Sequence, residues 1–496
     1  MVSGKTIIKN FSVMMATQLF TWSMAFVLAI FVPRYLGPTG LGEISIAGSI
    51  WSIMGVLISF GMDVHIIKTV ARDAEKTAEV LGTSLVIRFA FFALACVIVS
   101  LYLFFVQYDT RIVIVTAIIG VSSLFGTVAS ALGSALVGIE RMDLTSLNDI
   151  LTKILGTTIT ILVIFVGYGV YVIAAVGVIN SIFGILFMGY FIIQQSKIHL
   201  RFSFDEAKEM LRVSAPYLIT GVTISAYQQI DTLFIASLVD TKTVGWYNTA
   251  VNLFGTLMFL PVAFGNVTFP ALSRSYVSAQ DKLHMIARRS IDLMFLFSIP
   301  IGLGIMVVSK PLVLLLYGAE FTASGPVLAV LGTVLIFTYL ATMLGQLLIS
   351  TDRTNKWNMV MIGWALLTIP LDMVLVPWTH AVFKNGALGG ALSYLLTEGG
   401  MVFGAILLLP KGTLQWSNVR IAALSLVSGL LMVSTSWWFR DNLMIVSILV
   451  GALTYCASVL LFRVIPHEDF ILIRDVALGM LDRLRKGKDS SASVSD

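Results

Sequence analysis

Residues 326–350 have the sequence PVLAVLGTVLIFTYLATMLGQLLIS, which contains no charged side chain. A helix rises about 1.5 Å per residue, so about 20 apolar residues cross the hydrocarbon core of a bilayer. The stretch is long enough for such a crossing, and its apolar residues do not alternate as they do in a β-barrel strand. We therefore interpret residues 326–350 as a transmembrane helix.

Segments of the same kind recur along the whole chain. Apolar residues make up 57% of the 496 residues and charged residues only 12%, whereas a soluble domain carries about 25% charged residues. This composition predicts an all-α integral membrane protein with about fourteen spans. The predicted spans are 10–32, 41–62, 84–106, 112–136, 147–167, 171–194, 213–238, 244–268, 285–308, 326–350, 357–377, 387–409, 418–438 and 442–463.

Lys and Arg residues indicate the orientation of the spans. If both termini are placed in the cytoplasm, most basic loop residues fall on the inner side, as the positive-inside rule requires. An odd number of spans would erase this asymmetry, so we predict a multi-pass protein of the cell (plasma) membrane with both termini cytoplasmic. The net charge of +5 then indicates contact with anionic membrane lipids, not with nucleic acid. The few basic residues left on the outer side are Arg34, Arg111, Lys242, Lys310, Lys384 and Arg440.

The chain resembles itself at two offsets. At an offset of 203 residues the matching pairs are Phe31 and Phe234, Gly42 and Gly245, and Ala47 and Ala250. At an offset of 212 the matches run from Gly120 and Gly332 to Arg141 and Arg353, and acidic Glu140 and Asp352 precede the matched arginines. Low-complexity apolar sequence also gives matches by chance. A true duplication predicts two six-helix lobes that point the same way, a parallel repeat of the kind found in transporters.

The duplication sets the predicted domain boundaries. Residues 1–196 form an N-lobe of spans 1–6, and residues 213–410 form a C-lobe of spans 7–12. Between them, 197–212 is predicted to be an amphipathic cytoplasmic linker, in which Ser203 and Glu206 have capping-box spacing. Two extra C-terminal spans occupy 411–465, and 466–496 is predicted to be a cytoplasmic amphipathic helix with a disordered tail.

A few ionisable residues fall inside predicted spans, where a charge is costly unless it faces a cavity or a partner. Asp231 and Glu398 lie near the middle of their spans and have no long stem, so we expect both to face an internal aqueous cavity. Asp372 follows Pro370 in the outer half of its span. We expect its side chain either to face an internal cavity or to reach the outer interface. Together Asp231, Glu398 and Asp372 are the candidates for binding a coupling ion.

Basic residues are the candidates for binding an anionic substrate head group. Arg88 and Lys153 lie within spans and Arg34 lies in an outer loop. Arg88 and Lys153 have an alternative interpretation, since either could extend to the inner headgroups. Lys153 also has the i,i+4 spacing for a structural ion pair with Asp149.

No motif for catalysis or cofactor binding is present. The sequence has no HExxH, GxSxG or GxxxxGK[ST] pattern, and its five histidines and two cysteines are scattered. We therefore predict no enzymatic activity, no cofactor and no metal site. Two lobes in one chain favour a transporter that works by alternating access. Without an ATP-binding loop, the work must come from an ion gradient or from the gradient of the substrate.

Several short motifs, in order along residues 5–465, resemble the polysaccharide flippase family of the multidrug/oligosaccharidyl-lipid/polysaccharide exporter superfamily. They are RYLGPTGLG at 34–42, DTLFI at 231–235, GWY at 245–247, YGAEFTAS at 317–324 and GGA at 389–391 with Glu398. Related drug antiporters usually have twelve spans, so the extra pair favours the polysaccharide branch.

The resemblance implies a V of two six-helix lobes that opens alternately to either membrane face. It implies a flippase that moves a polyprenyl-diphosphate-linked oligosaccharide from the inner to the outer leaflet for polysaccharide or glycan assembly. Basic residues in the cavity of such proteins point to Arg88 and Lys153 here, although neither match is exact. Polymerases and glycosyltransferases are the candidate protein partners.

Two other functions stay open at this stage. The first is a cation-coupled antiporter of small amphiphilic drugs or metabolites, which would share the fold and the mechanism. The second is a membrane scaffold subunit of a polysaccharide assembly complex that transports nothing itself.

Overall fold

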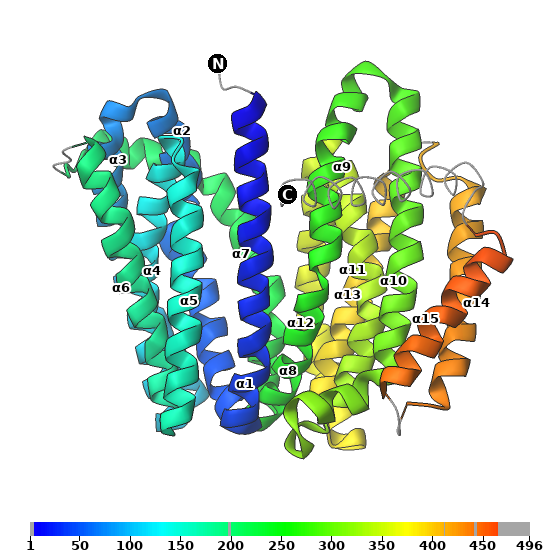
Figure 1. Ribbon diagram of the computed structural model, residues 1–496. Coiled ribbons are helices and arrows are strands. Elements are labelled where there is room, and N and C mark those ends of the chain that lie inside the picture. Colours follow the sequence, from blue (N-terminus) through cyan, green and yellow to red (C-terminus); the bar gives the residue numbers. More distant parts are fainter. Residues whose placement is uncertain (1–3, 197–199, 411, 441–443, 465–496) are drawn as a thin grey trace, which may run out of the picture.

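The computed structural model of the chain describes residues 4–196, 200–410, 412–440 and 444–464. Within these ranges all regular structure is helical (Figure 1). Twelve helical stretches are long and apolar enough to cross a membrane, as judged by length and composition. The predicted all-α membrane fold is confirmed, whereas the count of fourteen spans stays a prediction. The predicted surface helix and tail at 466–496 lie outside the described residues.

The helices α1 to α6 form one bundle, on the left of Figure 1. Its first helix, α1, contains the first predicted span and residues 41–59 of the second, and it bends at Gly37, where φ is 68° and ψ is 176°. A glycine adopts this backbone conformation at little cost, and Pro38 cannot continue the hydrogen bonding of the preceding turn. The bounds are α1 Gly4–Ser59, α2 Met62–Arg72, η1 Ala74–Lys76, α3 Thr77–Val106, α4 Thr110–Gly138, α5 Met142–Val166 and α6 Val170–Ser196.

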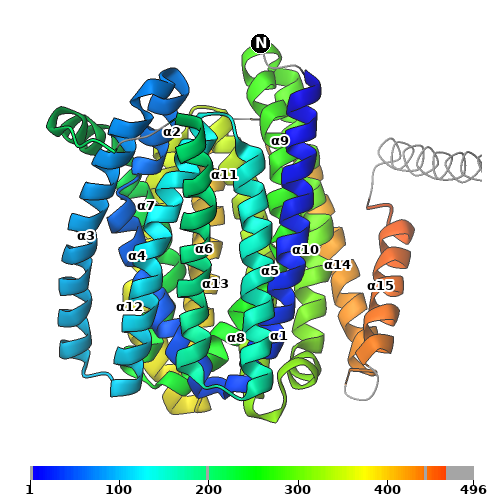
Figure 2. The same ribbon diagram turned by 60° about the vertical axis from the view of Figure 1, so that its left-hand side comes forward.

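The helices α8 to α15 form the second bundle, on the right of Figure 1, and Figure 2 shows α14 and α15 at its outer side. Its central helix is α11, which contains the stretch quoted first from the sequence. In the most apolar 18-residue stretch of α11, 67% is buried inside the protein, whereas the corresponding share in α12 is 17%. The bounds are α8 Thr241–Leu257, α9 Phe259–Ser278, α10 Gln280–Tyr317, η2 Ala319–Phe321, α11 Ser324–Ser350, α12 Thr354–Phe383, α13 Ala387–Leu408, α14 Trp416–Trp437 and α15 Met444–Leu461.

The helix α7, Phe204–Leu238, links the two bundles. Its first turn is capped as predicted, because the Ser203 side chain accepts a hydrogen bond from the Glu206 backbone N–H at 3.4 Å. The helix then runs without a break from the predicted linker into the predicted seventh span. Its first turns pack on the first bundle, where Glu206 Oε1 lies 2.8 Å from His65 Nε2 and Met210 is fully buried. Its later turns pack against α12 of the second bundle.

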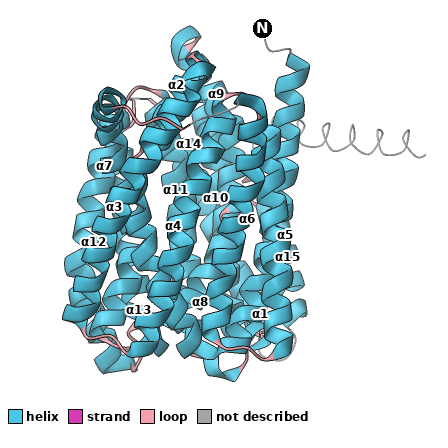
Figure 3. Ribbon diagram, turned by 90° about the vertical axis from the view of Figure 1, so that its left-hand side faces the viewer, coloured by secondary structure: helices cyan, strands magenta, loops and turns pink. Residues whose placement is uncertain are grey.

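The offset of 212 residues seen in the sequence has a structural counterpart. Glu140 and Asp352 both have positive φ, 62° and 57°. Directly after them, the N–H groups of Arg141 and Arg353 donate to the carbonyls five residues earlier, at 2.9 Å in each case. The two halves therefore build the same turn at the matched positions, between α4 and α5 in the first half and between α11 and α12 in the second. Figure 3 shows the long helices packed side by side.

The bundles meet at the lower end of Figure 1, where α1 packs on α8. Gly42 lies against the backbone carbonyl of Thr241, and Gly245 lies against that of Pro38, so closely that neither position has room for a Cβ atom. Pro38 and Thr241 are separated by the same offset as Gly42 and Gly245. The two contacts are thus copies of one another, related by the sequence repeat.

Replacing either of these glycines is expected to force the bundles apart. In Gly42→Ala or Gly245→Ala the new methyl group meets a backbone oxygen, which cannot rotate away. We expect a loss of about 1–3 kcal/mol in the free energy of unfolding, the usual effect of overpacking, measured on the purified chain in detergent.

Gly48→Ala on α1 and Gly255→Ala on α8 are the matched controls, because a Cβ atom at either position meets nothing within 4 Å. Equal stability of all four variants would contradict the close backbone contact.

Candidate functional site

Two carboxylates from different helices lie together inside the second bundle. Asp231 on α7 is 5% exposed and Asp372 on α12 is fully buried. The Tyr247 hydroxyl donates to Asp231 Oδ2 at 2.5 Å, and Asp372 lies within electrostatic reach of Asp231. The alternative that Asp372 reaches the outer interface is therefore wrong, because its side chain is fully buried in the protein.

Two consecutive glycines on α13 allow this arrangement. A Cβ atom at Gly389 would collide with the α12 backbone at Val376, and one at Gly390 would meet Ile235 and Tyr247. Without side chains here, α13 comes close enough to α7 and α12 to enclose the carboxylates between the three helices. The pair is sealed from lipid by this packing.

The enclosed oxygens lack partners. Asp231 Oδ1, both carboxylate oxygens of Asp372 and Ser393 Oγ are buried without a hydrogen-bond partner among the described residues. Two ionised carboxylates repel one another, so such a pair is stable only with a bound proton or cation between them. The arrangement is chemically suited to holding one.

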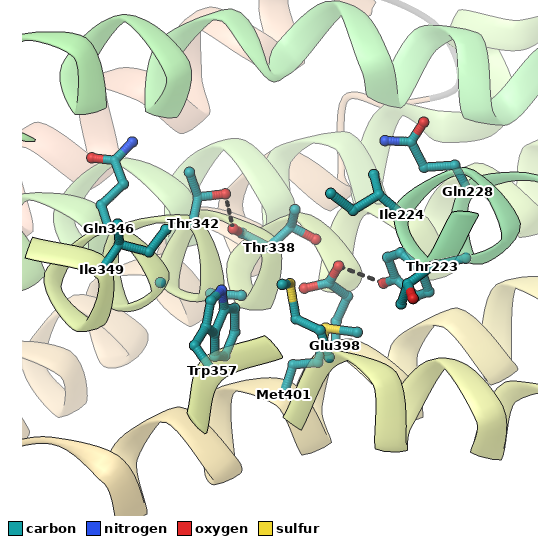
Figure 4. A pocket seen from close by; sticks show the side chains of 14 residues that line it. Thr223, Ile224, Gln228, Thr338, Thr342, Gln346, Ile349, Trp357, Glu398 and Met401 are labelled. Atoms are coloured by element: carbon teal, nitrogen blue, oxygen red, sulfur yellow. Dashed lines mark hydrogen bonds between the residues drawn. The ribbon is translucent and has the colours of Figure 1, made fainter. Parts of the chain in front are cut away.

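Glu398 on α13 lines a cavity of about 290 Å³ between α7, α11, α12 and α13 (Figure 4). The side chain is 4% exposed, and its Oε1 atom accepts a hydrogen bond from the Tyr227 hydroxyl at 2.6 Å. Its Oε2 atom has no hydrogen-bond partner among the described residues. Asp231, which we expected to face a cavity as well, does not line this one. That Glu398 faces an aqueous cavity stays a prediction.

Arg88 is held inside the first bundle by an ion pair. Its guanidinium is 2% exposed, and Nη2 lies 2.8 Å from Oδ1 of Asp63, a residue at the start of α2. Its Nε atom donates to Ser84 Oγ at 3.2 Å and Nη1 donates to the Thr127 carbonyl at 3.0 Å. The interpretation that Arg88 extends to the headgroups is therefore wrong, because its charge is satisfied within the protein.

This ion pair borders a small polar cavity. Two serine hydroxyls on α4 also donate to Asp63 Oδ1, Ser130 at 3.0 Å and Ser134 at 2.8 Å. The cavity has a volume of about 330 Å³, and its wall consists mainly of hydroxyl groups and glycines beside the Asp63–Arg88 pair. It presents hydrogen-bonding groups without a net charge.

The other basic candidates lie elsewhere. Lys153 on α5 is half-buried, and no ion pair joins it to Asp149 among the described residues. Arg34 is exposed just before the bend at Gly37. Neither residue lines the cavity beside Arg88. The structure therefore does not bring the three basic candidates together.

A larger cavity of about 730 Å³ lies between the bundles. Its wall combines Phe26 and Ala29 of α1 with Asn252 and Thr256 of α8 and Phe259 of α9. It lies on the α1–α8 interface that closes at Gly42 and Gly245. Asn252 contributes a polar side chain to this wall.

Sequence reasoning missed the partners of the charged residues. Asp63 directly follows the second predicted span and was not among the candidates, yet it pairs with Arg88. Tyr227 and Tyr247 bind Glu398 and Asp231 through single hydroxyls, and nothing in their local sequence distinguishes them from lipid-facing tyrosines. The only available signal was that buried carboxylates require donors.

Comparison with known proteins gives a consistent result. Residues 31–326 match the sequence profile of a family described as "Polysaccharide biosynthesis protein". The probable flippase AglR of Haloferax volcanii is 25% identical over 288 residues, which is 55% of this chain and 56% of AglR. The probable low-salt glycan biosynthesis flippase Agl15 of the same organism is 23% identical over 54% of this chain and 57% of Agl15. The chain thus spans about half the length of these relatives.

Solved structures share the fold at low sequence identity. A lipid II flippase MurJ in an inward closed conformation aligns with a TM-score of 0.72 and 16% identity, covering 92% of this chain and 99% of that one. An inward-facing multidrug resistance transporter of the MATE family and MOP superfamily aligns with a TM-score of 0.61 and 16% identity, covering 78% of this chain and 93% of that one. The helical architecture is therefore shared by lipid flippases and drug transporters.

Removal of Asp63 is expected to destabilise the first bundle. Asp63→Asn leaves the buried Arg88 charge without its counter-ion, which costs about 1–3 kcal/mol in the free energy of unfolding. The control is Asp143→Asn, which breaks an Arg141–Asp143 pair whose aspartate is 60% exposed, and an exposed pair contributes under about 1 kcal/mol. Equal effects of the two variants in a denaturation experiment would contradict a structural role for the buried pair.

Proposed function

The chain belongs to the polysaccharide biosynthesis protein family, and on this premise we propose that it is a flippase for a polyprenyl-diphosphate-linked oligosaccharide. It carries the head group from the inner to the outer leaflet for polysaccharide or glycan assembly, while the lipid tail stays in the bilayer. The observation that carries the proposal is the combination of this family membership with a cavity between two repeated bundles. Transporters are commonly built from such repeated bundles around a central site.

The contact between α1 and α8 supports alternating access. The bundles touch at the end where Gly42 and Gly245 meet carbonyl oxygens, and the 730 Å³ cavity adjoins this contact. By the distribution of Lys and Arg, this closed end is the outer one, so the described state faces the cytoplasm. Breaking the two glycine contacts and closing the opposite end would expose the same cavity to the outside.

The first bundle supplies the candidate contacts for the head group. Hydroxyl groups beside the Asp63–Arg88 pair suit the hydroxyls of a sugar, and Arg88 suits a phosphate oxygen if Asp63 exchanges its partner. Lys153 and Arg34 remain candidates for the diphosphate in other conformations. Because Lys153 and Arg34 do not line the cavity beside Arg88 in the described state, they would contact the diphosphate at other points of the route.

The second bundle supplies the candidate site for a coupling cation. Asp231 and Asp372 present unpartnered oxygens to each other, and Glu398 presents one to the neighbouring cavity. A proton or a sodium ion bound between the aspartates would remove their mutual repulsion. The free energy gained when this repulsion is removed would link ion binding to the position of α7, because α7 carries Asp231 and also packs on the first bundle.

A liposome assay tests the flippase proposal. The full chain is reconstituted with a radiolabelled polyprenyl-diphosphate oligosaccharide, and its exposure on the outer leaflet is measured with and without a cation gradient. We expect Asp231→Asn, Asp372→Asn and Glu398→Gln each to slow the gradient-driven rate by about tenfold or more, because a coupling energy of about 1.4 kcal/mol or more is lost.

The exposed variant Asp143→Asn serves as the control and should keep the rate. Movement of small amphiphilic cations with no movement of the labelled lipid would favour the drug antiporter. Glycan export that persists in cells after Asp231, Glu398, Arg88 and Lys153 are all replaced would favour the scaffold.

Labelling from the two sides of the membrane tests alternating access. In a chain with Cys96→Ser and Cys456→Ser, the variant Asn252→Cys should react with an impermeant maleimide from the cytoplasmic side. Under turnover with substrate and cation it should also react from the outer side, since the cavity then opens there. Ser290→Cys, at a position that is 3% exposed, should react from neither side. Labelling of Asn252→Cys from one side only under all conditions would contradict the mechanism.

A further inference from the structure

The ion pair of the first bundle exposes its two charges unequally. The Arg88 side chain is 2% exposed, whereas the Asp63 side chain is 32% exposed. Each guanidinium nitrogen donates to a group of the protein, Nε to Ser84 Oγ, Nη1 to the Thr127 carbonyl and Nη2 to Asp63 Oδ1. The charge that a ligand meets in the adjoining cavity is therefore the negative one, although the pair as a whole is neutral.

The two oxygens of Asp63 differ in how they are bonded. Oδ1 accepts hydrogen bonds from Arg88, Ser130 and Ser134. None of the described residues donates to Oδ2, and the Asp63 side chain borders the cavity. A carboxylate accepts strong, charge-assisted hydrogen bonds from hydroxyl donors. Oδ2 is thus available to a ligand that carries hydroxyl groups.

The rest of the cavity wall is uncharged and rich in hydroxyl groups. Ser52 and Ser59 of α1 and Ser123 of α4 contribute to it, and Arg88 is the only basic residue of the described chain that does. At Gly55, which also lines the cavity, a Cβ atom would meet nothing within 4 Å. The volume of about 330 Å³ lies at the lower limit for small-molecule sites. The cavity therefore has room for one sugar unit and not for a whole oligosaccharide.

The helix α7 contacts the same stretch of α1 that forms the cavity wall. The Ser225 hydroxyl donates to the Ser52 carbonyl at 3.2 Å, and a Cβ atom at Gly221 would meet Val56, another residue of the wall. Because α7 connects the two bundles, the cavity lies beside this connection (Figure 1). A head group that crosses between the bundles would pass it.

We propose that Asp63 is a specificity-determining residue, and that this cavity takes an uncharged sugar unit of the head group and discriminates against a uronic acid. Sugar hydroxyls donate to Asp63 Oδ2 and exchange hydrogen bonds with the serines of the wall. A sugar carboxylate would meet the Asp63 carboxylate with no exposed cation beside it, and like charges brought together in an interface repel one another strongly. The inference rests on the proposed flippase function, because it names the class of sugar that the flippase accepts.

The test measures binding of lipid-linked sugars to the purified full chain in detergent, by competition with radiolabelled polyprenyl-diphosphate glucose. Three unlabelled competitors carry glucose, glucuronic acid or the methyl ester of glucuronic acid, which differ only in the group on the exocyclic carbon. At neutral pH we expect the glucuronic acid carrier to compete about tenfold or more less well than the other two. The neutral ester separates the effect of charge from that of size, and this comparison uses the unmodified chain.

Variants locate the discrimination at Asp63. Asp63→Asn combined with Arg88→Gln removes both charges, so no buried charge loses its counter-ion, and the preference should fall to about twofold or less. Gly55→Leu places a side chain in the cavity at a position where helix propensity favours the change, and it should weaken binding of all three carriers by about tenfold. The exposed variant Asp143→Asn is the control and should keep the wild-type preference. Thermal melting shows that each variant is folded.

Three results would overturn the proposal. They are equal competition by glucuronic acid and its methyl ester in the wild-type chain, a preference that persists in the folded double variant, and no saturable binding of any carrier. A chain that shows the preference in this binding assay and yet moves no labelled lipid in liposomes would contradict the flippase function and leave the selectivity of the cavity standing.

Discussion

The architecture depends on a contact between backbone atoms of two helices, Gly42 against the Thr241 carbonyl and Gly245 against the Pro38 carbonyl. Because neither contact has room for a side chain, the bundles meet there more closely than packed side chains would allow. The two contacts are related by the sequence repeat, so matched positions of the two halves provide both parts of the closure. A closure built from backbone and glycine carries no strong polar bond, which suits the separation of the bundles that the proposed alternating access requires.

The two bundles differ in whether their buried charged groups have partners. In the first, Arg88 and Asp63 pair with one another and serine hydroxyls donate to Asp63. In the second, Asp231, Asp372 and Glu398 keep oxygens without partners. Arg88 and Asp63 therefore balance one another's charge within the first bundle, whereas the second bundle holds carboxylate oxygens that a proton or a cation would satisfy. The repeat therefore supplies a common scaffold on which the halves have become chemically different.

The sequence predicted what local pattern determines and failed where distant residues meet. Residues 326–350 were correctly predicted as a helix, and the Ser203 cap followed from its spacing to Glu206. The environment of Arg88 was not predictable, because Asp63 comes from another helix and its contact depends on how α2 is placed against α3. In the same way, the hydroxyl that donates a hydrogen bond to Glu398 belongs to Tyr227, a residue 171 positions earlier. Hydropathy reports where a charge lies along a span, not which neighbour faces it.

The connecting helix α7 brings these features together. Its first turns are anchored in the first bundle by Met210 and by the Glu206–His65 pair, and its later turns carry Tyr227 and Asp231 of the second. The backbone between them is a continuous helix in which Pro216 removes one hydrogen bond, and sharp helix bends are almost always found at such residues. A change in the charge at Asp231 therefore acts on a segment that is rigid at both ends and weakened between them. The coupling that we propose between ion binding and bundle movement thus follows a covalent path, with no need for a chain of side-chain contacts across the interface.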